Sequence, residues 1–190
     1  MQAAAAERYC HCMAQAWERQ PDPRWQALFP DAAALQAEVN RWRLGEWVPG
    51  GVVSLLRVAR DLLVDSYFVY SYSFAAAEKA LQALEACLRG CLPIPEGQLD
   101  RRGLNQLISE GAGARRGLLS PVEFDVLRST AGFRNDIAHG KITCHEDLAK
   151  AYGPTDVLMF VQSIHEAVTD LYRRAIEQQV VASLPAGVRG

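Results

Sequence analysis

The sequence has little net charge, few aromatic residues and no long hydrophobic run. Lys and Arg number 20 against 22 Asp and Glu, and this formal net charge of −2 disfavours a general nucleic-acid binder. No apolar run approaches the roughly 18 residues that a membrane-spanning helix needs, so we expect no membrane partner. The N-terminal Met1-Gln2-Ala3-Ala4-Ala5-Ala6-Glu7-Arg8 has no basic flank before an apolar stretch. We therefore predict no signal peptide and a cytoplasmic protein.

The chain also lacks the short motifs of common hydrolases and metal sites. It contains no G-x-S-x-G, no H-E-x-x-H and no Cys-x-x-Cys, and its five cysteines cannot all pair. Cys10-His11-Cys12 has no second ligand pair at a finger-like distance, so we expect no metal and no cofactor. Cys87 and Cys91 are interpreted as buried thiols of a reducing compartment. His145-Glu146-Asp147 is interpreted as a solvated loop, and His165 is expected to be partly exposed.

Helical periodicity, by contrast, runs through most of the chain, and no segment favours a strand convincingly. The Tyr-rich stretch Tyr67–Tyr72 fits the helical pattern better than a strand. The pattern predicts an all-α bundle. The expected helices are 3–19, one after Pro30-Asp31, a run from Val52 to about Leu88 that breaks near residue 66, a short helix at 102–110, a capped helix at 121–139, and a last helix through Val157–Ala175.

The clearest punctuation is Gly45-Glu46-Trp47-Val48-Pro49-Gly50-Gly51, which indicates a boundary. We expect residues 1–48 to form an N-terminal helical extension, 51–180 the main bundle and 181–190 a loose tail. All four tryptophans lie before residue 48. Their concentration predicts that the N-terminal helices dock on the bundle through large aromatic surfaces.

The polar cluster Phe133-Arg134-Asn135-Asp136-Ile137-Ala138-His139-Gly140 is the best candidate site. It falls at the end of the expected 121–139 helix, which Ser120, Pro121 and Glu123 open as cap, first residue and capping box. Asn135 and His139 are four apart and share one helix face, so the amide is in reach of the imidazole. An Arg that holds a phosphate and a His of tunable charge suit metal-free phosphodiester chemistry.

Arg134-Asn135 followed by Ala138-His139-Gly140 resembles the R-x4-6-H signature of the HEPN superfamily, in its RN-x-x-AHG form. Four residues separate Arg134 from His139, as that signature requires. The resemblance extends over about Gly51 to Gln179. It implies an HEPN-like up-and-down helical bundle, here with an additional N-terminal helical pair.

The resemblance further implies a metal-independent endoribonuclease that acts as a toxin or defence effector. Its catalytic residues would be Arg134, His139 and Asn135, set in a composite site of a homodimer formed through the motif helix, near residues 121–145. RNA is the implied substrate, DNA is not expected, and an antitoxin or a neighbouring-gene protein would be a further partner. Some HEPN toxins carry a Tyr two residues beyond the His, which the antitoxin modifies. This chain has Lys141 there, so that mode of neutralisation is not expected.

A second hypothesis stays open, a non-catalytic HEPN-like helical module that binds a nucleotide or a partner protein. The distribution of charge along the chain is compatible with the endoribonuclease and with the binding module. Seven basic residues against four acidic ones between Arg101 and Lys141 give that stretch a local charge of +3, consistent with a basic groove or a basic loop.

Overall fold

The computed structural model describes residues 19–92, 102–112, 118–121, 123–129 and 152–183, and every regular element among them is an α-helix. The all-α prediction is therefore confirmed for this part of the chain. None of the helices in the described ranges is both long and apolar enough to cross a membrane. The elements are α2 (Pro23–Gln26), α3 (Ala32–Asn40), α4 (Gly50–Asp65), α5 (Tyr72–Cys91), α7 (Leu104–Ala112) and α10 (Pro154–Ser183), and residues 123–129 are also helical.

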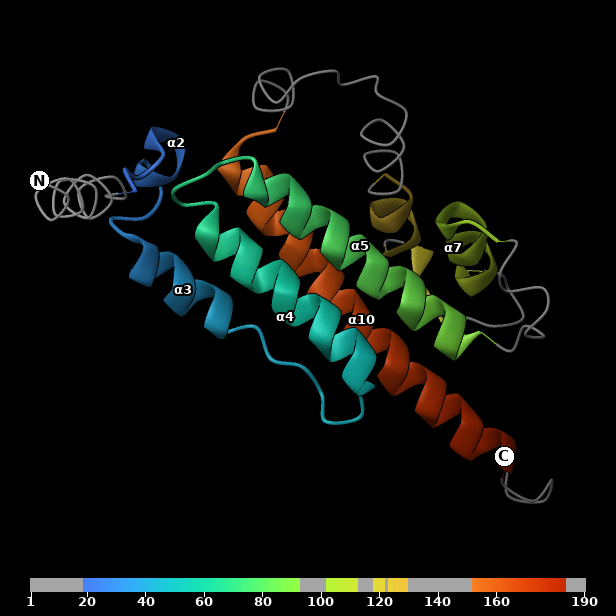
Figure 1. The fold of residues 1–190 in the computed structure, drawn as a ribbon. Helices are drawn as coiled ribbons and strands as arrows, with labels where there is room; N and C mark the ends of the chain where they lie inside the picture. Colours follow the sequence, from blue (N-terminus) through green and yellow to red (C-terminus); the bar gives the residue numbers. More distant parts are fainter. Residues whose placement is uncertain (1–18, 93–101, 113–117, 122, 130–151, 184–190) are drawn as a thin grey trace, which may run out of the picture.

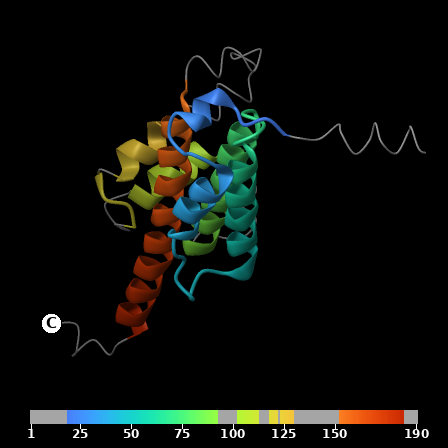
Figure 2. The ribbon, with the colours of Figure 1, turned by 90° about the vertical axis from the view of Figure 1, so that its left-hand side faces the viewer.

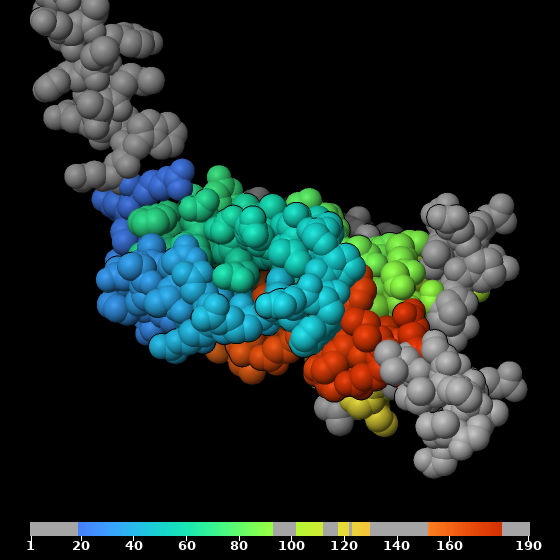
Figure 3. Space-filling model, turned by 90° about the horizontal axis from the view of Figure 1, so that it is seen from below, coloured from blue at the N-terminus to red at the C-terminus, as the bar shows by residue number. Residues whose placement is uncertain are grey.

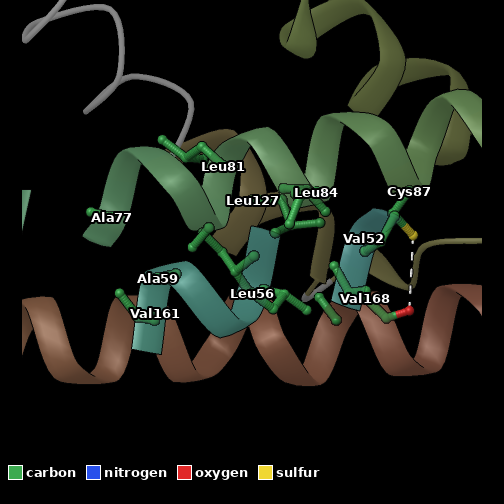
Figure 4. Close-up of a cluster of buried hydrophobic side chains, with 14 of the residues drawn as sticks. Val52, Leu56, Ala59, Ala77, Leu81, Leu84, Cys87, Leu127, Val161 and Val168 are labelled. Carbon is green, nitrogen blue, oxygen red and sulfur yellow. Dashed lines mark hydrogen bonds between the residues drawn. The ribbon is translucent and has the colours of Figure 1, made fainter. Parts of the chain in front are cut away.

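Three long helices form the centre of the bundle. α4 runs antiparallel to α5 and α10, which lie side by side and run in the same direction (Figure 1). One face of α4 is buried because its apolar residues recur every three or four positions. Figure 4 shows these residues meeting α5 and α10 across the core, with Ala59 beside Val161 and Val52 beside Val168. The buried residues of α4 are Val52, Leu56, Ala59 and Leu63.

The turn between α4 and α5 corrects one prediction. The expected break near residue 66 is present, but residues 67–71 form the turn itself and not the start of the next helix. Tyr67 and Tyr70 face the core instead of following a helical face, and both are nearly fully buried. The Tyr67 hydroxyl donates to the Phe29 carbonyl oxygen at 3.2 Å. The tyrosines thus close the turn by burying their rings while their hydroxyls find backbone acceptors.

The described part of the N-terminal segment docks on the bundle, as the tryptophan distribution predicted. Trp25 in α2 is fully buried, and Trp42, just beyond α3, is almost so. Both belong to the same hydrophobic core as α4, α5 and α10. The Asp31 carboxylate accepts from the Ala34 amide at 2.8 Å and caps α3, which packs along α4. The predicted 3–19 helix lies outside the described residues, apart from its last position.

The last helix agrees with the sequence pattern in its core face and differs at its end. Val157, Val161, Ile164, Val168 and Leu171 of α10 are all buried. Asp156 accepts from the Gly153 amide at 2.8 Å near the start of α10. The helix continues to Ser183, beyond residue 181 where the loose tail was expected to begin.

Candidate functional site

The three residues predicted to be catalytic, Arg134, Asn135 and His139, lie outside the described residues. The structure does describe the start of the predicted 121–139 helix. We call Ser120, Pro121 and residues 123–129 the capped segment. Its contacts determine how the predicted motif helix is attached to the rest of the bundle.

The predicted capping box is present at the start of this segment. The Ser120 amide donates to Oε2 of Glu123 at 2.8 Å, and the Glu123 amide donates to Oγ of Ser120 at 3.2 Å. The two residues thereby satisfy each other's backbone N–H groups, which have no acceptor within the first turn of a helix. The predicted helix start at Ser120–Glu123 is confirmed.

An ion pair with α10, which sequence reasoning did not find, fixes the same carboxylate. Arg174 donates from Nη1 to Oε2 and from Nη2 to Oε1 of Glu123, both at 2.7 Å. Arg174 Nη1 also donates to the Leu118 carbonyl oxygen at 2.7 Å. Partial burial raises the pKa of Glu123, but hydrogen bonds from Arg174 and Ser120 outweigh it and lower that pKa to about 2. Glu123 is therefore ionised at neutral pH and ties the capped segment to α10.

Apolar contacts hold the capped segment on its other sides. Leu127 is buried and lies beside Leu84 of α5 in the core (Figure 4). Just before the capped segment, the amides of Leu118 and Leu119 both donate to the Gly111 carbonyl oxygen at 3.1 Å, which ties the chain there to α7. Figure 2 shows residues 123–129 across α10 from α4. The start of the motif helix is thus packed against three helices.

An open pocket of about 210 Å³ lies between the capped segment and α10. Glu123, Glu166 and Asp170 give this pocket three carboxylates, and Glu123 and Asp170 are partly neutralised by Arg174. The pocket therefore has no excess of positive charge that would attract a phosphate. Its other lining residues are Val126, Leu127, Ser163 and Ala167.

The chain is also anchored where description resumes after the predicted motif. The Tyr70 hydroxyl donates to the Tyr152 carbonyl oxygen at 2.6 Å, just before α10 begins. The guanidinium of Arg24 lies 3.6 Å from the centre of the Tyr70 ring, and Asp22 accepts from Arg24 at 2.8 and 2.7 Å. Burial raises the pKa of Tyr70 to about 12, so its hydroxyl remains a donor at neutral pH. Both described ends of the interval that contains the motif are therefore held by specific contacts.

His165 corrects another prediction, because it is buried and not partly exposed. Its exposed fraction is 1%, and its ring lies 5.9 Å from that of Trp42. Nε2 of His165 has no hydrogen-bond partner among the described residues. Burial, with a smaller contribution from the charge of Arg60, lowers the pKa of His165 to about 4. The imidazole is thus a neutral core residue at physiological pH, and Trp42, in the connection after α3, packs against it.

The predicted burial of Cys87 and Cys91 is confirmed. Cys87 and Cys91 are free and buried, with their sulfur atoms 3.9 Å apart. The Cys87 thiol also lies 3.8 Å from the Val168 carbonyl oxygen (Figure 4). The described residues contain no group of three or more side chains placed to hold a metal. Cys10-His11-Cys12 and His145-Glu146-Asp147 fall outside them.

Comparisons of the chain with protein-family models, with curated proteins and with solved structures give no match.

Proposed function

We propose that this protein is a metal-independent endoribonuclease of HEPN type, acting as a toxin or defence effector. The observation that carries the proposal is the sequence motif Arg134-Asn135, Ala138-His139-Gly140, which follows along the chain a capped helix start that is tied to the bundle. The all-helical architecture of the described residues supports it. A helix fixed at its first turn also holds side chains at its far end in a defined position, as catalysis requires.

In the proposed reaction, the 2′-oxygen of a ribose attacks the adjacent phosphorus while His139 takes up the hydroxyl proton. The bond from phosphorus to the 5′-oxygen breaks, and this oxygen leaves as a hydroxyl by accepting the proton that His139 took up. The products are a 2′,3′-cyclic phosphate and a 5′-hydroxyl end. Arg134 stabilises the negative charge that builds up on the phosphate, and Asn135 orients the imidazole or holds the phosphate.

The site is proposed to be composite, with two copies of the chain bringing their motif helices together. One helix end alone encloses a substrate poorly, and a second copy would complete the cleft. In this arrangement the homodimer interface lies near residues 121–145. Light scattering coupled to size exclusion is expected to give twice the chain mass of 21.0 kDa. A monomer with full cleavage activity would refute the composite site.

The pocket beside the capped segment favours a second candidate, a non-catalytic helical module that binds a partner protein. The pocket is lined by the carboxylates of Glu123, Glu166 and Asp170 together with apolar residues that include Val126 and Ala167. Such a lining suits a basic or amphipathic protein segment better than the phosphates of a nucleotide. An antitoxin or a protein from a neighbouring gene would be a partner of this kind.

The deciding experiment incubates purified protein with mixed structured and single-stranded RNA in excess chelator. The wild type is compared with Arg134→Ala, His139→Ala and a matched control, His145→Ala, which removes a histidine outside the motif. We expect cleavage by the wild type and by the control, with cyclic-phosphate ends, and none by the two motif variants. Folding of every variant is checked by circular dichroism and thermal melting.

Two outcomes would contradict the nuclease. Equal cleavage by wild type and His139→Ala would exclude His139 as a catalytic residue. Absence of cleavage by all proteins, together with a partner that co-purifies in a defined ratio, would favour the binding module. Expression supplies a further check, because a toxin should depress growth of the host and the His139→Ala variant should not.

A further inference from the structure

A cluster of arginines lies away from the capped segment, where α4 meets the connection of residues 41–49. Arg57 and Arg60 are three residues apart on α4, so they share one side of that helix. Arg60 donates to Oδ1 of Asn40 at 3.1 Å and reaches the Trp42 carbonyl oxygen at 3.4 Å. These contacts hold Arg60 against the connection at Trp42, which Arg43 directly follows in the sequence. Arg57 and Arg43 both act electrostatically on Arg60, so charged groups from α4 and from the connection lie near one another.

Arg43 and Arg57 are exposed, and neither makes an ion pair or hydrogen bond with the described residues. Burial lowers the pKa of Arg60; Asp61 opposes this, and the charges of Arg57 and Arg43 lower the pKa further. Asp61 is thus an attractive neighbour of Arg60, but it forms no ion pair with the cluster. The like charges repel one another without a full counter-charge. A bound anion would remove this repulsion.

Trp47, on the same connection, is an exposed aromatic residue that is held in place. Its side chain has an exposed fraction of 46%, the largest apolar side chain so exposed in the described ranges. Its indole Nε1 donates to the Thr169 carbonyl oxygen at 3.4 Å. At Gly45, an added Cβ would lie 2.3 Å from Cε2 of Trp47, so the ring packs against a backbone that only glycine leaves open. The indole therefore presents its remaining surface to solvent in a fixed orientation.

The connection lies at the molecular surface next to α4 and α10 (Figure 3). Within this connection, Trp42 contacts His165 and Trp47 contacts Thr169. The connection therefore lies along one turn of α10. At about 100° per residue, these two α10 positions face a different direction from Ala167, which lines the pocket at the capped segment. Arg43 and Trp47 lie on this connection and Arg60 bonds to it, so this region of the surface is separate from that pocket.

We infer that Arg43, Trp47, Arg57 and Arg60 form a binding surface for single-stranded RNA, with the arginines on the phosphates and Trp47 stacked on a base. We call it the Arg–Trp surface. The choice of RNA as its ligand rests on the proposed function, whereas the positions of its residues do not depend on that function. Guanidinium groups match phosphate oxygens in a bidentate manner, and an exposed indole stacks on any unpaired base. An acidic polypeptide would use the arginines but would leave the indole without a role, and a duplex would keep its bases stacked inside.

The test measures binding of the full chain to a short, fluorescently labelled single-stranded 2′-O-methyl RNA by anisotropy. Because the methyl group blocks attack by the 2′-oxygen, binding is measured without cleavage. The variant Arg43→Gln/Arg57→Gln is compared with Arg41→Gln/Arg173→Gln. Both lose the same charge, but Arg41 is paired with Glu38 at 2.7 Å and Arg173 with Asp170 at 3.1 Å.

We expect the variant Arg43→Gln/Arg57→Gln to bind RNA more weakly than the wild type and to show a smaller salt dependence of binding. The slope of log K against log salt should fall by about 1.4, from about 0.7 for each lost phosphate contact on a single strand. The paired control should keep the wild-type slope. Trp47→Ala should weaken binding about 5- to 150-fold, while Trp47→Phe retains most of it. Thermal melting of each variant separates loss of binding from loss of fold.

Four results would overturn the inference: no RNA binding by the wild type, equal loss in both double variants, equal affinity for duplex RNA, or equally effective competition by polyglutamate. Cleavage of unmodified RNA is measured in parallel, so the two proposals fail separately. Binding that depends on the Arg–Trp surface without cleavage would refute the nuclease alone. Cleavage that needs His139 while binding ignores Arg43 and Arg57 would refute the Arg–Trp surface alone.

Discussion

The burial of His165 predicts a loss of stability in mild acid, which the variant His165→Phe should reduce. The imidazole is 1% exposed beneath Trp42, and its pKa is lowered to about 4 from the model-peptide value of 6.5. As the pH falls, the unfolded chain therefore takes up this proton first. Proton uptake by the unfolded state favours unfolding. The stability associated with His165 is thus lost between about pH 6.5 and pH 4.

The magnitude follows from the two pKa values of His165. A difference of 2.5 between 6.5 and about 4 corresponds to roughly 3.4 kcal/mol over the full range. Between about pH 7 and pH 5, where most carboxylates stay ionised, the same values give a loss of about 2 kcal/mol. For a chain of this size, that change lowers the melting temperature by about 4–8 °C.

The assay is urea unfolding of wild type and His165→Phe at about pH 7 and pH 5, with the slope m compared at each pH. We expect the wild type to lose about 2 kcal/mol more than the variant over this interval. The remaining histidines are present in both proteins, so their contributions cancel in the difference. Equal losses would refute the reasoning, because they would mean that His165 reaches protons in the folded state.

Two further predictions concern the capped segment and the connection that carries Trp47. Glu123→Gln should lower the free energy of unfolding by about 1–3 kcal/mol at neutral pH, because Arg174 loses its charged partner. In denaturant unfolding, the difference in this free energy between wild type and variant should shrink as the pH falls from about 4.5 towards 2. A gap that persists at the lowest pH would contradict the ionised state. Gly45→Ala should lower the free energy of unfolding by about 1–3 kcal/mol, because the new Cβ meets the Trp47 ring. Gly51→Ala places its Cβ in open space and should raise the free energy of unfolding by about 0.5–1 kcal/mol. Thermal melting of this matched pair tests both signs, and equal shifts would exclude the clash.

Local sequence rules predicted the elements whose signals lie within a few residues of each other. The helix starts after Asp31 and at Ser120 are predictable because a cap and the backbone amide that donates to it lie within one turn. The core faces of α4 and α10 followed from apolar residues at helical spacing. The same spacing failed at Tyr67 and Tyr70, because aromatic residues that close a turn continue an apolar pattern without continuing a helix.

The sequence by itself determined the all-α class, the break between α4 and α5, and a motif at Arg134–His139 whose chemistry is still a prediction. Only the tertiary structure decided the burial of His165, since its exposure depends on where Trp42 comes to lie and not on its own helix. The pairing of Glu123 with Arg174, and the lack of a partner for Arg43 among the described residues, were likewise invisible in the sequence. Arg174 lies 51 positions from Glu123 in the sequence. Whether a guanidinium group is paired depends on which helices pack against each other. Helical periodicity records which face is apolar, whereas the neighbour of a charged side chain is set by packing between elements far apart in the chain.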